Sequence, residues 1–207
     1  MKIAVVAANG KAGQLITKEA VERSLDVTAI VRSENKTVAH QVLQKDLFDL
    51  TKEDIAPFDV IVDAFGQMNK DKLNEHSQSL EHLSNLVSDS QKRLIIIGGA
   101  GSLYVDKAHT AHTERLIDSP DMPEEVKPIS MAQVKTFEEI KKRDDVQWTF
   151  VCPAPDFQFD GEKTGTYKVS DDEVIGTHVS YADFAKAIVD EAMGPEHIQS
   201  RFAVFAK

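Results

Sequence analysis

Short runs rich in valine and isoleucine alternate along this chain with longer stretches in which apolar residues recur at the spacing of a helix. The candidate strands are 2–8, 26–31, 41–45, 59–65, 93–98 and 147–152. Several of these runs are apolar throughout, which is typical of strands that helices cover on both faces of a sheet. Helical patterns occupy 11–24, 72–89, 123–143 and the stretch that follows Ser180. The alternation predicts the α/β class, with a single doubly wound, Rossmann-type parallel sheet and helices on both of its faces.

The polar stretch 156–177 interrupts the alternation. Within it, Gly161, Gly165 and Gly176 flank a short candidate strand at 166–169. We interpret the stretch as a small excursion over the carboxyl edge of the sheet, on the substrate side, because ligands of open α/β sheets bind outside the carboxyl ends of the strands. No linker or internal repeat divides the chain, so residues 1–207 are predicted to form one domain.

The charge balance excludes some classes of partner. The 207 residues include 24 basic and 34 acidic side chains, a formal net charge of −10, whereas surfaces that bind nucleic acids need an excess of Lys and Arg. No apolar run approaches the length of a membrane span, and the single Cys152 allows no internal disulfide. His109 and His112 lack a third ligand at a recognisable spacing, so no metal is predicted. We expect a cytoplasmic protein, a monomer or small homo-oligomer, that binds neither nucleic acid nor a membrane.

The loop after the first candidate strand has the features of a phosphate-binding turn. Gly10 would let the backbone approach a ligand, and Gly13 would let the following helix pack closely on the strand. The helix N-terminus offers free N–H groups and a partial positive charge. A plain tight turn between strand and helix is the alternative. The residues of this loop that we predict to bind a dinucleotide are Ala7, Asn9, Gly10, Lys11, Ala12 and Gly13.

The end of the second candidate strand indicates which dinucleotide is preferred. Proteins that bind NAD often carry an acidic residue there for the ribose 2′-hydroxyl, whereas this chain has Arg32, followed by Ser33 and Lys36. Arginine can form a bidentate pair with a 2′-phosphate. The sequence therefore favours NADP(H) over NAD(H), with a solvated surface charge as the alternative interpretation of Arg32.

Taken in order, the motifs of the chain resemble those of the atypical short-chain dehydrogenases. The resemblance rests on residues 1–13, 27–32, 46–47, 63–66, 97–103, 118–123, 148–154 and 179–185. It points to the bacterial NADH-flavin reductase family of NAD(P)-binding Rossmann proteins, which is related to biliverdin-IXβ/flavin reductase and to the NmrA-like proteins. One departure is that the family's first loop usually begins with glycine, where this chain has Ala7.

The resemblance implies further contacts with the cofactor. Asp46 and Leu47 would lie near the adenine, although a helix cap and a core leucine are the alternative interpretation of these two residues. The other cofactor-binding residues that it implies are Ala64, Phe65 and Gly66 along the ribose and phosphates, and Gly98, Gly99, Ala100 and Pro153 near the nicotinamide.

The sequence shows no conventional acid–base pair. Short-chain dehydrogenases use a tyrosine and a lysine four residues later on one helix, whereas Tyr104 and Lys107 are three residues apart and Tyr181 and Lys186 are five apart. Hydride transfer to a flavin needs little acid–base help, because stacked rings suffice and solvent can supply the proton. Ser102 is the only candidate catalytic residue, and a loop serine bonded to its own backbone is the alternative. The aromatic residues that could wall a flavin pocket or belong to the core are Phe65, Tyr104, Phe157 and Phe159.

The resemblance implies an NAD(P)H-dependent oxidoreductase that reduces free flavin, as FMN, FAD or riboflavin, or a similar planar acceptor by direct hydride transfer. The flavin would be a substrate and not a bound prosthetic group. A non-catalytic NAD(P)-binding redox sensor of the NmrA type is the alternative. An epimerase or isomerase would need an acid–base pair that the sequence does not show.

Overall fold

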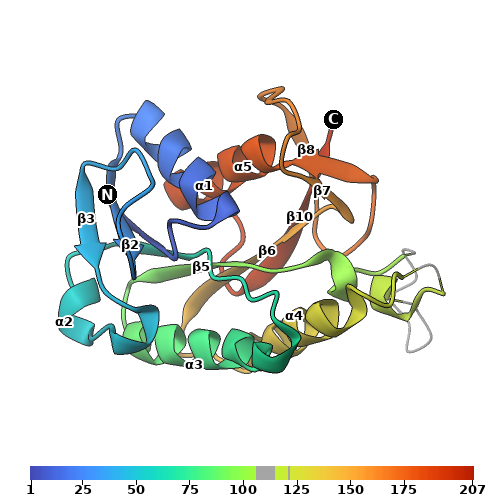
Figure 1. The fold of residues 1–207 in the computed structure, drawn as a ribbon, viewed down its shortest axis with the longest axis horizontal. Coiled ribbons are helices and arrows are strands. Elements are labelled where there is room, and N and C mark those ends of the chain that lie inside the picture. Colours follow the sequence, from blue (N-terminus) through green and yellow to red (C-terminus); the bar gives the residue numbers. More distant parts are fainter. Residues whose placement is uncertain (106–114, 121) are drawn as a thin grey trace.

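The computed structural model describes residues 1–105, 115–120 and 122–207. Its main element is an eight-stranded sheet with the order β3-β2-β1-β4-β5-β6-β10-β8 (Figure 1). Neighbouring strands are parallel except for β8, which is antiparallel to β10. The order of the first six strands is that of a doubly wound sheet, which confirms the predicted fold class. The strands are β1 (Lys2–Val6), β2 (Asp26–Val31), β3 (Gln41–Gln44), β4 (Val60–Asp63), β5 (Arg93–Ile97), β6 (Gln147–Pro153), β8 (Tyr167–Ser170) and β10 (Ser200–Ala206).

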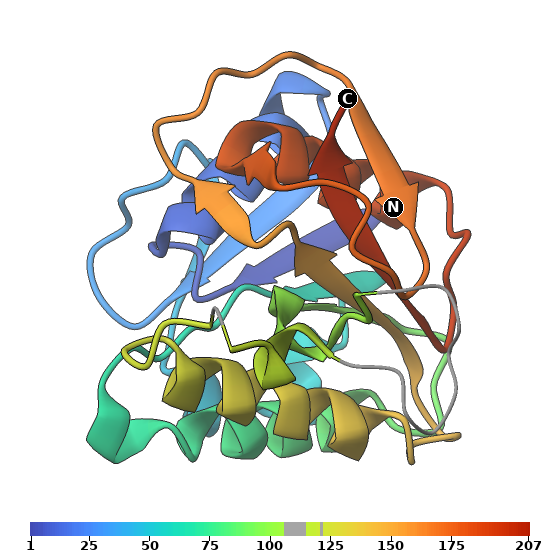
Figure 2. The same cartoon turned by 90° about the vertical axis from the view of Figure 1, so that its right-hand side faces the viewer.

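Two pairs of helices cover the two faces of this sheet. One pair is α1 (Lys11–Glu22) with α5 (Tyr181–Met193), and the other is α3 (Glu75–Val87) with α4 (Lys127–Ile140). Figure 2 shows the sheet between these two layers. No helix in the described part of the chain is long and apolar enough to cross a membrane. The shorter helical elements are α2 (Lys52–Ile55) and 3₁₀ turns at Leu47–Asp49, Lys70–Lys72, Ala100–Ser102 and Leu116–Asp118.

The central strands are buried on both of their faces. Ala4, Val5 and Val6 of β1 and Leu94 and Ile95 of β5 have no exposed surface. This burial accounts for the continuously apolar runs, because neither set of alternating side chains meets solvent. The loops after β1, β2, β4, β5 and β6 all leave the sheet at its carboxyl edge, which is where ligands of such sheets bind.

Two elements differ from the sequence-based expectation. The strand β10 was not predicted, although its buried run follows α5 after Gly194 and Pro195, which are typical signals of a helix end. The third predicted helix, expected from residue 123, corresponds to α4, which begins at Lys127. The preceding residues form a turn, in which the N–H groups of Val126 and Lys127 both donate to the carbonyl of Pro123 at 3.1 Å.

The polar stretch 156–177 contributes to two different parts of the molecule. Its first residues form β7 (Asp156–Gln158), which pairs with β9 (His178–Ser180) in a separate parallel pair. The short strand expected at 166–169 exists as β8, but it extends the edge of the main sheet instead of crossing the strand ends. Thr164 and Gly165 lie between β7 and β8 in the chain. The side chain of Asp183 in α5 accepts hydrogen bonds from Thr164 and from the Gly165 N–H at 2.7–3.1 Å.

Candidate functional site

Two hollows open at the carboxyl ends of the parallel strands. The first, which we call the basic hollow, has a volume of about 660 Å³ and lies beyond β1, β2 and β4. The second, the apolar hollow, has a volume of about 760 Å³ and lies beyond β4, β5 and β6. Gly10 and residues 64–66 line both, so the two hollows adjoin beside the N-terminus of α1.

The structure brings most of the predicted binding residues to these hollows. Those in the basic hollow are Ala7, Asn9, Arg32, Asp46 and Leu47. Those in the apolar hollow are Lys11, Ala12, Gly98, Gly99, Ala100 and Pro153. The shared boundary consists of Gly10, Ala64, Phe65 and Gly66. Gly13 and Ser102 line neither hollow.

The turn between β1 and α1 presents the start of the helix to the boundary of the hollows. Ala7 has a φ of +55°, in the left-handed region, and its carbonyl accepts a hydrogen bond from the Gly10 N–H at 2.9 Å. No side chain caps α1, so the N–H groups of its first turn remain available to a ligand. A Cβ on Gly13 would lie 2.7 Å from the Cα of Ala8, so this glycine allows the helix to pack on the strand.

Asn9 connects this turn to the loop after β2. Its Nδ2 donates to the carbonyl of Glu34 at 2.8 Å and to Oγ of Ser33 at 3.3 Å. Its Oδ1 accepts a hydrogen bond from the Lys36 N–H at 2.8 Å. The side chain therefore holds the loop that carries Arg32 and Lys36 at the rim of the basic hollow.

Four cationic side chains line the basic hollow, and they differ in their partners. The Nζ atoms of Lys45 and Lys72 lie 2.6 and 3.8 Å from carboxylate oxygens of neighbouring acidic residues. Arg32 and Lys36 form no ion pair within residues 1–105, 115–120 and 122–207. The hollow thus offers two positive charges that are free to pair with an anionic ligand.

Asp46 and Leu47 have the structural roles of the alternative interpretation, a helix cap and a core leucine. Asp46 caps the 3₁₀ turn at Leu47–Asp49 by accepting a hydrogen bond from the Phe48 N–H at 3.0 Å. Leu47 is buried. Both residues also line the basic hollow, so the two interpretations do not conflict.

The buried Asp63 orders the boundary between the two hollows. Its Oδ1 accepts a hydrogen bond from the Phe65 N–H at 3.0 Å, and burial raises the pKa of this carboxyl from 3.8 to about 6. The ring of Phe65 packs edge-on against Phe48 and His76, with centroid distances of 6.3 and 5.8 Å. These contacts hold Phe65 in the wall that both hollows share.

Glycines and aromatic rings shape the apolar hollow. A Cβ on Gly98 would lie 2.0 Å from the ring of Phe150, so a side chain there would displace the packing beneath β5. Phe157 of β7 and Tyr181 at the start of α5 also line the hollow, and their rings stack with centroids 3.5 Å apart. In the sequence, Tyr181 stands out only as a possible partner of Lys186. Its position directly after the helix cap, at the carboxyl edge of the sheet, was the signal that could have identified it.

Ser102 is not brought to the hollows. It is 2% exposed, and its hydroxyl accepts a hydrogen bond from Nη1 of Arg201 at 2.7 Å. The same nitrogen donates to the Ser102 carbonyl at 3.0 Å, while Nε of Arg201 donates to Asp172 at 2.8 Å. Because the hydroxyl is engaged in the core, its placement does not support the predicted catalytic role. This contact does not follow from the sequence patterns, because they do not reveal β10, the strand that carries Arg201.

The other candidates from the sequence are dispersed. Phe159 lies under the ammonium group of Lys11, which is 4.7 Å from its ring centroid, and Tyr104 does not line either hollow. Lys107, His109 and His112 lie outside the described residues.

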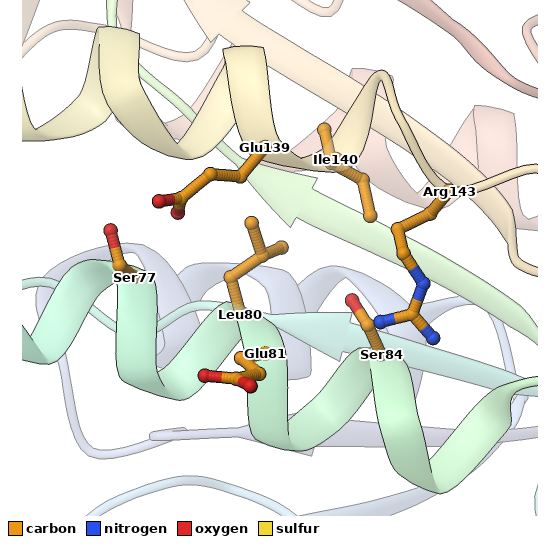
Figure 3. Close-up of a pocket in the computed structure, with 7 residues that line it drawn as sticks. All are labelled: Ser77, Leu80, Glu81, Ser84, Glu139, Ile140 and Arg143. Carbon is orange, nitrogen blue, oxygen red and sulfur yellow. The ribbon is translucent and has the colours of Figure 1, made fainter.

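A third hollow, of about 310 Å³, lies between α3 and α4 (Figure 3). Arg143, which lines it, already donates two hydrogen bonds at 2.7 Å to Asp145. None of the predicted binding residues is found there. Figure 3 shows its lining residues on α3, on α4 and on the turn that follows α4, not at strand ends. The candidate site is therefore the pair of hollows at the carboxyl edge.

The fold and this site define a class of protein. A doubly wound sheet, a turn with glycines after β1 and an uncapped helix N-terminus beside a hollow at the strand ends are the features of a Rossmann-type dinucleotide-binding protein. A family model described as NAD(P)H-binding matches residues 7–195. The chain belongs to this NAD(P)H-binding family.

The chain is similar over its full length to proteins from several bacteria. It is 41% identical over 215 residues to the protein YwnB of Bacillus subtilis (strain 168), covering 100% of this chain and 99% of that one. A putative NADH-flavin reductase from Streptococcus pneumoniae TIGR4 is 46% identical, with a TM-score of 0.95 over 100% of both chains. A putative epimerase from Bacteroides thetaiotaomicron is 26% identical, with a TM-score of 0.83 over 99% of this chain and 96% of that one. These similarities confirm the family resemblance that the motifs indicated.

Proposed function

We propose that this protein is an NAD(P)H-dependent oxidoreductase that passes hydride from NADPH to a free flavin or a similar planar acceptor. The observation that carries the proposal is the junction of the basic and apolar hollows at the N-terminus of α1. The basic hollow would suit a phosphorylated adenosine, and the apolar hollow would suit the nicotinamide together with an acceptor ring. The similarity to the putative NADH-flavin reductase supports the same class of reaction.

The residues present fit a dinucleotide that extends through both hollows. The uncapped first turn of α1 would receive the pyrophosphate, with Gly10, Lys11 and Ala12 beside it. A Cβ on Gly66 would meet no atom within 4 Å, so there is open space at the strand end where a ribose would pass. Residues 98–100 and Pro153 would lie along the nicotinamide.

The protein's own contribution to such a reaction is mainly positional. A bound dihydronicotinamide would supply the hydride. The side chains of Phe65 and Phe157 would hold the acceptor ring in the apolar hollow and limit the access of water to it. Hydride transfer requires the reacting atoms to approach within about 3–3.5 Å, and solvent can supply the proton that completes the reduction.

The preference for NADPH follows from the cations of the basic hollow. We predict that Arg32→Glu weakens NADPH binding roughly 10- to 100-fold, because a charge-assisted hydrogen bond to the 2′-phosphate is replaced by repulsion. NADH, which lacks this phosphate, should lose less than about 3-fold. Titration of the protein with each dinucleotide, followed by the fluorescence of the reduced nicotinamide, measures both affinities.

A matched control for this change is Lys18→Glu. Lys18 is an exposed residue of α1 that lines neither hollow and pairs with Glu22 at 3.8 Å. The substitution Lys18→Glu alters the net charge by the same amount as Arg32→Glu. Equal losses of NADPH affinity in the two variants, or an unchanged ratio of NADPH to NADH affinity in Arg32→Glu, would show that Arg32 does not contact the 2′-phosphate.

Turnover distinguishes the oxidoreductase from a second candidate, a redox sensor that binds NAD(P)H without oxidising it. The observation that favours the sensor is that Ser102, the catalytic candidate from the sequence, is bonded to Arg201 inside the core. Mixing the protein with NADPH and FMN, FAD or riboflavin, and following the absorbance of the reduced nicotinamide, tests both. We expect oxidation to depend on protein and flavin together. Tight NADPH binding without oxidation by any flavin or quinone would favour the sensor.

A further inference from the structure

The apolar hollow has one wall built from a fixed stack of aromatic rings. Phe157 of β7 and Tyr181 of α5 lie with their planes 7° apart and their centroids at 3.5 Å. The fully buried Phe184 packs edge-on against Phe157 at 4.9 Å, and Phe159 packs edge-on against Tyr181 at 5.5 Å. Because β7 pairs with β9 and α5 begins directly after β9, backbone structure sets the position of both stacked rings.

The phenol of Tyr181 differs from that of Tyr167 in its hydrogen bonding. The Tyr167 hydroxyl donates to Asp190 at 2.6 Å, outside both hollows. The Tyr181 hydroxyl forms no hydrogen bond with any residue that the structure describes, and the rings of Phe157 and Phe159, which pack against the Tyr181 ring, offer no conventional acceptor. A half-buried phenol of this kind is normally satisfied by a ligand or by water.

The charged groups of the apolar hollow are already engaged. Among the described residues these are Lys11, whose ammonium group lies over the Phe159 ring, and Asp156, which accepts a hydrogen bond from the Gln158 amide at 2.5 Å. Burial raises the pKa of Tyr181, so its hydroxyl keeps its proton at neutral pH. Tyr181 is thus a neutral donor beside an apolar space, in which a hydrogen bond to developing charge is stronger than in water.

We propose that Tyr181 is a catalytic residue whose hydroxyl donates a hydrogen bond to the carbonyl or ring nitrogen of a planar acceptor on which negative charge develops, while the Phe157–Tyr181 stack supports the acceptor ring. This inference rests on the proposed function. It narrows the substrate class to conjugated planar acceptors that carry such a hydrogen-bonding atom, as flavins and quinones do.

The step balances without any further reagent. The C–H bond of the dihydronicotinamide breaks, and its electron pair and hydrogen form a new bond to the electrophilic atom of the acceptor. The nicotinamide is oxidised and the acceptor is reduced by two electrons. The negative charge moves to the conjugated heteroatom, where the Tyr181 hydroxyl donates its hydrogen bond and water finally supplies the proton. Tyr181 keeps its own proton throughout.

Two substitutions separate the hydroxyl from the ring. Tyr181→Phe keeps the stack and removes the donor, whereas Tyr181→Leu removes both. We expect Tyr181→Phe to lower kcat about 10-fold or more while the riboflavin Kd changes by less than about 3-fold. We expect Tyr181→Leu to raise that Kd by about 5-fold or more as well. Tyr167→Phe, which removes a phenol outside the hollows, is the matched control and should retain the kcat and Kd of the wild type.

A readout that does not depend on turnover completes the test. The visible absorption band of riboflavin bound to the oxidised protein should differ between the wild type and Tyr181→Phe, because a hydrogen bond to the ring system shifts the band, and Tyr167→Phe should match the wild type. If the wild type binds riboflavin but never oxidises NADPH, the proposed function fails. The difference in the band between the wild type and Tyr181→Phe still shows whether the Tyr181 hydroxyl contacts the bound ring. An unchanged band together with an unchanged kcat in Tyr181→Phe would overturn the proposal, as would a wild type that binds no riboflavin.

Discussion

Ala7 carries a methyl group at a position where the backbone enters the left-handed region. Its φ of +55° closes the turn between β1 and α1, and this conformation costs a non-glycine residue roughly 1–2 kcal/mol. The family that the motifs resemble usually has glycine at this position. The structure adds the physical reason, which is that only glycine adopts this conformation without steric cost.

We predict that Ala7→Gly stabilises the protein by about 1 kcal/mol or less, because relief of the turn is offset in part by the greater freedom of glycine in the unfolded chain. Thermal or urea unfolding of the two proteins measures the difference. A suitable control is Ala132→Gly, in the middle of α4, which should destabilise by about 1 kcal/mol. Destabilisation by both substitutions would contradict the interpretation that the backbone at Ala7 is strained.

Asp63 makes the stability of the protein depend on pH. Its folded-state pKa of about 6 lies above the ordinary value of 3.8. Between these two values the folded protein holds a proton that the unfolded chain has lost, so this group makes stability fall as the pH rises through that window. Above pH 6 the charged, buried carboxylate costs up to about 3 kcal/mol.

We predict that Asp63→Asn removes this cost and keeps the hydrogen bond from the Phe65 N–H. The variant should be more stable than the wild type at pH 7.5, and the difference should shrink as the pH is lowered toward 4. Melting temperatures of the two proteins across this range give the comparison. A difference that is independent of pH would mean that Asp63 does not titrate in this window.

At the scale of elements, the start of α5 holds parts of the candidate site in position. Ser180 is the N-cap and its hydroxyl accepts a hydrogen bond from the Asp183 N–H at 3.0 Å. The side chain of Asp183 in turn holds Thr164 and Gly165 of the polar stretch. This short segment therefore positions both the excursion and Tyr181, the first residue of the helix.

We predict that Ser180→Ala lowers the free energy of unfolding by about 1 kcal/mol, as expected for the loss of a helix cap. Denaturant unfolding measures the change. Ser77→Ala, at a half-buried position inside α3, is the matched control and should be neutral or slightly stabilising, since alanine is the better helix former. Equal effects of the two substitutions would argue against the capping role.

For the whole molecule, a buried ion pair connects the sheet to α5 at the edge opposite the hollows. Nη2 of Arg93, the first residue of β5, lies 2.6 Å from Oε1 of Glu191, and both side chains are less than a tenth exposed. Arg93 also donates to Thr149 of β6 at 3.2 Å, and Glu191 contacts His197 at 2.8 Å. The network ties β5, β6, α5 and the connection to β10 together.

We predict that Arg93→Met destabilises the protein by about 3–5 kcal/mol, because Glu191 is left as an uncompensated buried charge. Adding Glu191→Gln should recover a large part of this loss. NADPH affinity, measured well below the melting temperature of every variant, should stay unchanged, since the network lies away from the hollows. No recovery in the double variant would show that the loss does not come from the unpaired charge.

The alternation of apolar runs and helical patterns determined the doubly wound sheet, its carboxyl edge and the placement of Arg32 and the Ala7–Gly13 turn at that edge, which is where ligands of doubly wound sheets bind in general. These features follow from local periodicity and chain direction, which can be read directly from the sequence. Only the tertiary structure decided that Ser102 turns toward Arg201 and that Phe157 stacks on Tyr181. Such contacts join segments far apart in the chain, and packing in three dimensions selects them in a way that no spacing along the sequence encodes.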